Sequence, residues 1–160
     1  MTKINLKVFA GVLGLCLAST VQAGEGSGRM KHPLGFYGSL AGDPYISLLG
    51  ISLGWNLMSN LRVTAGYGST PLGIINGTTW GGGLKWLISD SSFTPVLGLN
   101  YSQFKGDFLG LVAIDAVNIV YVNAGFDWQA DVGFNFGIGV NKAINQSSTL
   151  IPYLSLGWFF

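Results

Sequence analysis

The chain has 160 residues, of which 9% are charged and 49% hydrophobic, and its mean hydropathy is +0.46. Ordinary soluble domains contain about 25% charged residues, so this composition is typical of a membrane protein. The formal net charge is only +1 and no basic patch is present, which excludes an electrostatic surface for nucleic acid. The length favours one domain.

Residues 1–23 are predicted to be a secretory signal peptide. Lys3 and Lys7 precede a short apolar run, and the segment closes on Val21-Gln22-Ala23, which favours cleavage after Ala23. The run is too short for a spanning helix. Residues 24–33 are then expected to be a flexible periplasmic lead-in, and residues 34–160 the folded domain.

The only cysteine, Cys16, lies inside the signal peptide. The mature chain is therefore expected to have no disulfide and no thiolate chemistry. Without Lys3 and Lys7 the mature chain keeps six basic residues against seven acidic ones.

Eight segments after residue 33 carry apolar residues at alternate positions, which is the period of a strand. No apolar stretch there reaches the 20 residues of a spanning helix. Only helices and closed barrels satisfy every backbone polar group in hydrocarbon. The sequence therefore predicts an all-β fold, an eight-stranded antiparallel up-and-down transmembrane β-barrel. The predicted strands are 34–42, 45–57, 61–69, 79–88, 93–103, 116–128, 132–141 and 150–160.

The connections between these strands alternate in length. Residues 58–60, 89–92 and 129–131 are short, whereas 69–78 and 105–117 are long. Bacterial barrels have short periplasmic turns and longer outer loops. The short connections are therefore placed on the periplasmic side with both termini. The loop at 42–44 is an exception because it is tight and lies on the outer side.

Tyrosine and tryptophan favour two levels of the predicted barrel, as expected for membrane–water interfaces. The tryptophans near the ends of strands two, four, six and eight share one rim, and tyrosines occupy the opposite one. The predicted aromatic girdle is Tyr45, Trp55, Tyr67, Trp80, Trp86, Tyr101, Trp128 and Trp158.

The last strand ends on an aromatic residue with apolar or aromatic residues at alternate positions before it: Leu154, Leu156, Trp158 and Phe160. In this pattern the chain resembles the small eight-stranded outer-membrane barrels of the OmpA-transmembrane, OmpX and OmpW type. The resemblance covers essentially all of 34–160 by pattern rather than by signature motif, and Pro152 departs from it. It implies a bacterial outer-membrane location, contact with outer-membrane lipid, and recognition of these four residues by the barrel-assembly machinery.

The inward positions predict a polar cluster near the periplasmic end, formed by Asn56, Arg62, Lys85, Asp127 and Asn135. A charge inside a narrow barrel must be paired or hydrated. An eight-stranded barrel is just wide enough for side chains to fill it, so we expect a plug rather than an open channel.

The outer half of the lumen leaves two alternatives open. Large inward residues facing glycines either interlock into a filled core or leave an apolar cup, which the apolar loop 105–117 covers. The possible cup and lid are Tyr37, Ile46, Leu48, Ile119, Tyr121, Tyr153, Phe108, Leu109 and Leu111. A cup with such a lid resembles the OmpW-type pathway for small hydrophobic compounds.

No catalytic, cofactor or metal site is predicted. The only histidine, His32, precedes the first strand, where no inward serine lies beside it for a lipid-modifying hydrolase. Asp107 and Asp115 are two isolated carboxylates, which is weak evidence for a cation site. The sequence thus favours a non-enzymatic structural or surface-interaction barrel. The alternatives are a transport barrel for a small hydrophobic ligand and, less favoured, an outer-membrane lipid-modifying enzyme.

Overall fold

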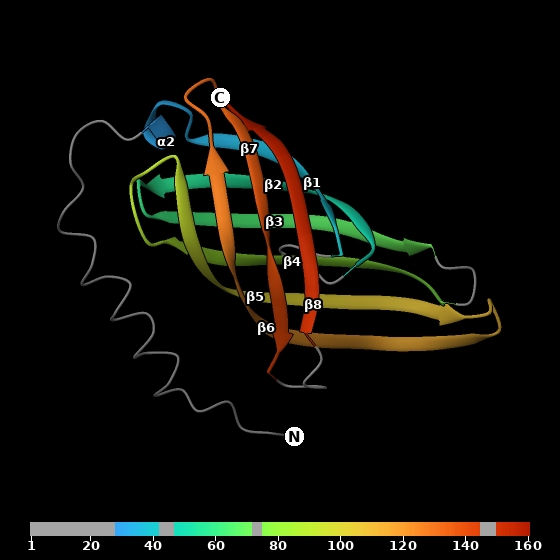
Figure 1. Ribbon diagram of the computed structural model, residues 1–160. Helices are drawn as coiled ribbons and strands as arrows, with labels where there is room; N and C mark the ends of the chain where they lie inside the picture. Colours follow the sequence, from blue (N-terminus) through green and yellow to red (C-terminus); the bar gives the residue numbers. More distant parts are fainter. Residues whose placement is uncertain (1–27, 42–46, 72–74, 145–149) are drawn as a thin grey trace.

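The computed structural model describes residues 28–41, 47–71, 75–144 and 150–160. These residues form a closed antiparallel barrel in which each strand pairs with the next and β8 pairs with β1 (Figure 1). The predicted fold class is confirmed. The elements are α2 (Gly28–Lys31), β1 (Leu34–Leu40), β2 (Leu49–Met58), β3 (Leu61–Pro71), β4 (Ile75–Leu87), β5 (Phe93–Phe108), β6 (Val112–Gln129), β7 (Phe134–Ala143) and β8 (Leu150–Phe159).

In the part of the chain that is described, no helix has the length and apolar character needed to cross a membrane.

Strict alternation along the strands separates an inner from an outer face. In β1 the burial pattern switches at every residue, so that Tyr37 and Ser39 point inward while Leu34, Phe36 and Leu40 point outward. The buried set of the described residues contains more polar than apolar side chains, and large apolar side chains dominate the exposed set. This arrangement is the inverse of a soluble barrel and suits a polar interior within a lipid environment.

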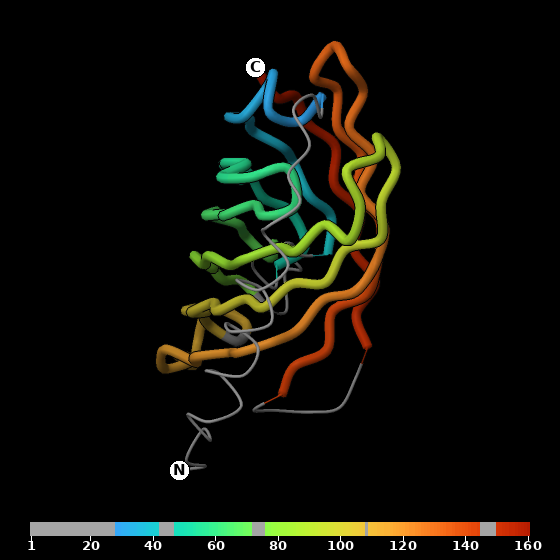
Figure 2. Tube along the Cα trace, turned by 90° about the vertical axis from the view of Figure 1, so that its left-hand side faces the viewer, coloured from blue at the N-terminus to red at the C-terminus, as the bar shows by residue number. Residues whose placement is uncertain are grey.

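The two ends of the barrel differ in what lies there. One end carries α2, the C-terminus and the short turns after β2, β4 and β6; we call it the plug end. The opposite end carries the β5–β6 turn and the ends of β3 and β4 that lie beside it, and the long strands extend there beyond the rest of the barrel (Figures 1 and 2). We call it the hairpin end.

The barrel wall is much taller on one side. β5 has 16 residues and β6 has 18, whereas β1 has 7 and β2, β7 and β8 have 10 each. The prediction of a long loop at 105–117 was wrong, because β5 and β6 continue through it and only 109–111 lie between them. The predicted loop 69–78 is likewise mostly strand. Within 105–117, Val112 and Ile114 pair with Phe108 and Gly106 of β5.

The turn of the β5–β6 hairpin places Leu109 in the left-handed region, with φ of 55°, followed by Gly110 with φ of 68°. The backbone N–H of Gly110 donates to Asp107 Oδ1 at 2.8 Å. Leu111 next to it is 84% exposed. The hairpin therefore ends in a defined turn that presents apolar side chains to its surroundings.

Candidate functional site

The centre of the plug end is an ion pair that crosses the lumen between the non-adjacent strands β3 and β6. Arg62 is the second residue of β3, and Asp127 lies near the end of β6. The two guanidinium nitrogens Nη1 and Nη2 of Arg62 donate to the two carboxylate oxygens of Asp127, at 2.8 and 3.2 Å. Arg62 is 1% exposed and Asp127 is 3% exposed. Paired hydrogen bonds of this kind combine charge with a fixed orientation.

Neutral side chains complete the hydrogen bonding of this pair. Arg62 Nε donates to Asn56 Oδ1 at 2.8 Å, and Arg62 Nη2 donates to Gln129 Oε1 at 3.1 Å. Asn135 donates to the Asp127 carboxylate at 3.1 Å. The ring of Phe159 lies 4.4 Å from the guanidinium carbon, which covers its remaining face. A buried charge is tolerated only when its hydrogen bonds are satisfied in this manner.

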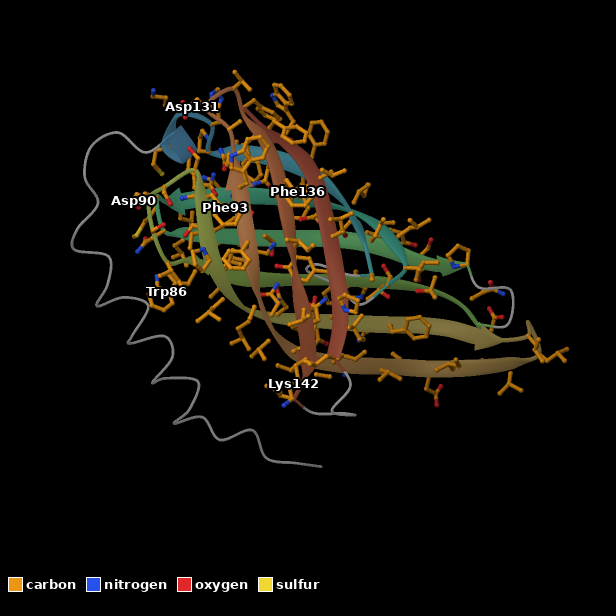
Figure 3. The ribbon with its side chains drawn as sticks, in the orientation of Figure 1. Trp86, Asp90, Phe93, Asp131, Phe136 and Lys142 are labelled. Atoms are coloured by element: carbon orange, nitrogen blue, oxygen red, sulfur yellow. The ribbon has the colours of Figure 1, made fainter. Side chains whose placement is uncertain are left out.

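Helix α2 lies at the plug end of the barrel, next to the ion pair. Its Arg29 is buried, and the guanidinium donates to the backbone carbonyl oxygens of Ser89, Ser91 and Ser92 in the β4–β5 turn, at 3.0, 2.6 and 3.4 Å. Burial lowers the pKa of Arg29 below its ordinary value, while Asp127 acts in the opposite direction. Residues 28–31 of the predicted lead-in therefore form a short helix that is hydrogen-bonded to the barrel. In Figure 3, Asp90 and Asp131 mark the two turns beside α2.

The plug and α2 are joined by side-chain amides. Asn56 Nδ2 lies 3.3 Å from the carbonyl oxygen of Arg29 and 3.4 Å from that of His32, and Gln129 Nε2 lies 3.4 Å from the latter. Asn56 also receives structural support through its backbone N–H, which donates to the carbonyl of Pro33 at 2.7 Å. The segment 28–33 and the ends of β2 and β6 thus form one hydrogen-bonded unit.

Lys85 is the cross-strand partner of Arg62, and its ammonium group lies near aromatic rings. Its ammonium nitrogen is 5.3 Å from the ring centre of Tyr37 and 5.8 Å from that of Tyr153, within the range of cation–π attraction. The structure thus brings Asn56, Arg62, Asp127 and Asn135 of the predicted cluster into one network and places Lys85 beside the tyrosines.

From the ion pair toward the hairpin end, the lumen is lined by neutral polar groups. Asn100 and Ser102 are buried, and neither the Asn100 amide nor the Ser102 hydroxyl has a hydrogen-bond partner among the described atoms. Asn100 leans onto Gly83, where a Cβ atom would lie 1.9 Å from its oxygen. Buried polar groups need partners, and a polar, roomy interior supplies them with water.

These placements bear on the alternative of an apolar cup, which was left open beside a filled core. Tyr37, Tyr121 and Tyr153 are buried, but they lie among Lys85 and neutral polar side chains. Leu48 is 39% exposed, and Ile119 is only partly buried. Ile46 and the Phe108 side chain fall outside the described part.

The predicted lid does not cover the lumen either. Leu109 is 53% exposed and Leu111 lies with it at the tip of the β5–β6 hairpin, far from the plug end (Figure 1). β5 pairs with β6 on one side and with β4 on the other as far as Phe108, so the segment continues the wall as a hairpin, while residues 112–120 of β6 pair in the sheet with β5 alone.

The outer wall carries aromatic side chains at both levels. Near the plug end, Trp128 contacts Phe134 and Phe134 contacts Trp158, with ring centres 5.7 and 6.4 Å apart. Toward the hairpin end, Trp80 and Tyr101 are in edge contact at 5.9 Å. Trp55, Trp86 and Tyr67 also point outward, and Tyr45 lies outside the described residues. Figure 3 labels Trp86, Phe93 and Phe136 on this wall.

The C-terminal strand closes the barrel against β1. The backbone N–H of Phe160 donates to the carbonyl of Leu34 at 2.7 Å, and Leu154, Leu156 and Trp158 lie on the outer face of β8. Recognition of these four residues during assembly stays a prediction.

The remaining chemistry-bearing residues are dispersed. The His32 ring nitrogen Nε2 lies 2.9 Å from the carbonyl oxygen of Asp131, and Asp107 caps the hairpin turn. Within the described ranges, no three His, Cys, Asp or Glu side chains are close enough together to hold a metal ion.

Three members of the plug were missed from the sequence. Arg29 precedes the strands and has no periodic signal. Gln129 falls just past the predicted end of strand six, and Phe159 belongs to the inward set of β8 together with Tyr153 and Ser155. Inward parity was the signal that could have found Gln129 and Phe159, because both continue the alternation of their strands.

The closed eight-stranded barrel, its exposed apolar wall and its buried polar interior define the chain as a small outer-membrane-type β-barrel. It matches no protein-family model and no curated protein. Among solved structures it is similar to the N-terminal β-barrel domain of Pseudomonas aeruginosa OprF, with a TM-score of 0.63 at 12% identity over 79% of this chain and 95% of that one. It is also similar to Neisserial surface protein A (NspA), with a TM-score of 0.46 at 15% identity over 78% of this chain and 90% of that one. The likeness to OprF shows the fold.

Proposed function

We propose that this protein is an integral outer-membrane barrel that conducts no solute and presents its tall β3–β6 wall outside the cell as an interaction surface. The observation that carries the proposal is the network around Arg62 and Asp127, whose members are at most 3% exposed. An eight-stranded barrel has a narrow lumen. Here the side chains of Arg62 and Asp127 meet across it, and α2 lies next to them at the plug end.

The outward role follows from the hairpin end. β5 and β6 continue well past the aromatic level of Trp80 and Tyr101. At that level Gln103 is the strand partner of Trp80 and bonds to Asn118 at 2.9 Å on the outer face. Polar side chains among the girdle aromatics are expected where a strand leaves hydrocarbon for water. The apolar tip, Leu109 and Leu111, is then exposed beyond the membrane, where large exposed apolar side chains mark interaction sites.

A pathway for hydrophobic compounds is less well supported. The lumen is lined by Asn, Ser and Thr side chains and by Lys85, which disfavour an apolar solute because it cannot satisfy their hydrogen bonds. The transport alternative also needs a lid over the lumen, but the residues proposed for the lid form the tip of the β5–β6 hairpin. The proposed role is therefore non-enzymatic and non-transporting.

Cysteine labelling on intact bacteria tests the orientation and the display of the tip. Leu111→Cys should react with a membrane-impermeant maleimide on whole cells, because it is 84% exposed at the hairpin end. Val132→Cys, which is 65% exposed in the β6–β7 turn at the plug end, should react only after the outer membrane is permeabilised. The opposite labelling pattern, or equal labelling of both, would contradict the proposal.

Conductance tests the sealed lumen separately. The refolded wild-type barrel in a planar lipid bilayer should give no current steps above the bilayer baseline. Stable open steps from the wild type would contradict a sealed plug even if the labelling pattern is as expected.

A further inference from the structure

The lipid-facing wall has a recess where β1 lacks a side chain. The outward residues of β1 are Leu34, Phe36, Gly38 and Leu40, and the glycine interrupts an otherwise large apolar series. A recess of about 510 Å³ lies over β8, β1, β2 and β3 at this point, with Gly38 in its floor. Its rim is formed mainly by Leu40, Leu49, Ile51, Leu154 and Leu156.

Packing within the protein does not require a glycine at this position. A Cβ atom on Gly38 would meet only the carbonyl oxygen of Gly50, at 3.8 Å. On Gly35 of the same strand it would lie 2.5 Å from the Phe159 ring, and on Gly157 of β8, the partner of Tyr37, it would lie 2.3 Å from the carbonyl oxygen of Phe36. Gly35 and Gly157 are therefore needed for internal packing, whereas the space at Gly38 opens outward. The φ angle of Gly38 is not positive, so its backbone conformation does not require a glycine either.

The recess extends from the apolar belt to the aromatic level toward the hairpin end. Gly38 pairs with Leu156 and Ile51, whereas Phe36, two residues nearer the plug end, pairs with Trp158. On the other side, Tyr67 lines the recess and pairs with Trp80 in the aromatic level toward the hairpin end. The recess thus occupies the hairpin-end half of the belt, which is the outer leaflet in the proposed orientation.

We propose that this recess binds one acyl chain of a membrane lipid. Its lining is apolar, it continues the lipid-facing belt, and its volume lies within the usual 300–1,000 Å³ of ligand sites. A second copy of the barrel fits it poorly, because two convex walls touch along their raised side chains and Leu40, Ile51 and Leu156 stand around the floor. A flexible hydrocarbon chain, in contrast, can enter below that rim.

Native mass spectrometry of the detergent-solubilised barrel, titrated with dimyristoyl phosphatidylethanolamine, tests the site. The wild type should retain one lipid more strongly than further ones. Gly38→Leu fills the recess and should weaken this first binding about tenfold, equivalent to ~1.4 kcal/mol, with Gly38→Ala intermediate. The control is Ala124→Leu, which adds the same kind of side chain to an exposed outward position of β6 and should leave the first binding unchanged.

Two outcomes would overturn the inference. One is equal first-lipid binding by the wild type and Gly38→Leu. The other is unchanged lipid binding together with a loss of dimers in Gly38→Leu, which would assign the recess to a second copy. The shift in gel migration between unboiled and boiled samples identifies folded protein, and Gly38→Ala retains the test if the leucine variant does not fold. The inference rests on the proposed membrane placement. The two are tested separately, because the labelling of Leu111→Cys and Val132→Cys can contradict only the placement, whereas the lipid titration can contradict only the binding of an acyl chain in the recess.

Discussion

The two halves of the lumen contain buried polar side chains of different kinds. At the plug end, Arg62 and Asp127 satisfy each other and are surrounded by amides from three further strand positions. Toward the hairpin end, Asn100 and Ser102 are equally buried but have no hydrogen-bond partner among the described protein atoms. A buried charge demands a complete set of partners, whereas neutral amides and hydroxyls are accommodated by water. We therefore expect the plug end to determine the stability of the barrel.

The same contrast holds outside the lumen. The plug end has short turns tied together by Arg29 and capped by α2. At the hairpin end the wall continues as β3–β6 alone, with an apolar tip. Because few packed side chains depend on that extension, changes there should affect surface contacts more than folding.

The largest expected effect comes from breaking the ion pair. Asp127→Ala leaves Arg62 buried without its carboxylate, and removing one partner of a buried pair costs roughly 3–5 kcal/mol. Urea unfolding of the refolded barrel should show a clear drop in midpoint. Val122→Ala, on the lipid-facing side of the same strand, is the control and should cost less. Equal midpoints for Asp127→Ala and the wild type would show that the plug end does not govern stability.

An intermediate effect is expected from Arg29→Ala. The variant removes the charged hydrogen bonds to the carbonyls of Ser89, Ser91 and Ser92, and a hydrogen bond to a charged group contributes about 1.5–3 kcal/mol. Limited proteolysis should cleave the 28–33 segment faster while the barrel stays intact. Lys31→Ala, an exposed position in α2, is the matched control. Unchanged cleavage in Arg29→Ala would mean that α2 is held by other contacts.

The smallest effect concerns the hairpin turn and has opposite signs at neighbouring positions. Leu109 has φ of 55°, a left-handed conformation that costs a non-glycine residue roughly 1–2 kcal/mol. Leu109→Gly should therefore slow hydrogen exchange of the hairpin amides by removing that strain. Leu111→Gly, whose φ is not positive, should speed it by adding backbone freedom. Both should leave the urea midpoint unchanged; a large drop in either would contradict the independence of the hairpin end.

Most residues of the plug could be predicted from the sequence. Their positions depend only on which alternate residues of each strand point inward and on how far along the strand they lie. Once alternate residues point inward, Arg62 near the start of one strand and Asp127 near the end of another are brought to the same level. Asn56 and Asn135 follow by the same rule. Arg29 did not follow, since it precedes the barrel and its position depends on carbonyl groups in a turn sixty residues away.

The sequence by itself determined the class of fold, because a polar interior, an apolar exterior and strand-length repeats leave a closed barrel as the way to satisfy backbone hydrogen bonds in lipid. It did not determine which segments extend beyond the membrane. Residues 105–117 have the composition of either a loop or a strand, and only pairing with β4 and with each other makes them a hairpin. The recess at Gly38 is likewise a tertiary feature: whether a glycine relieves a clash or leaves a gap depends on which side chains the neighbouring strands place in front of it.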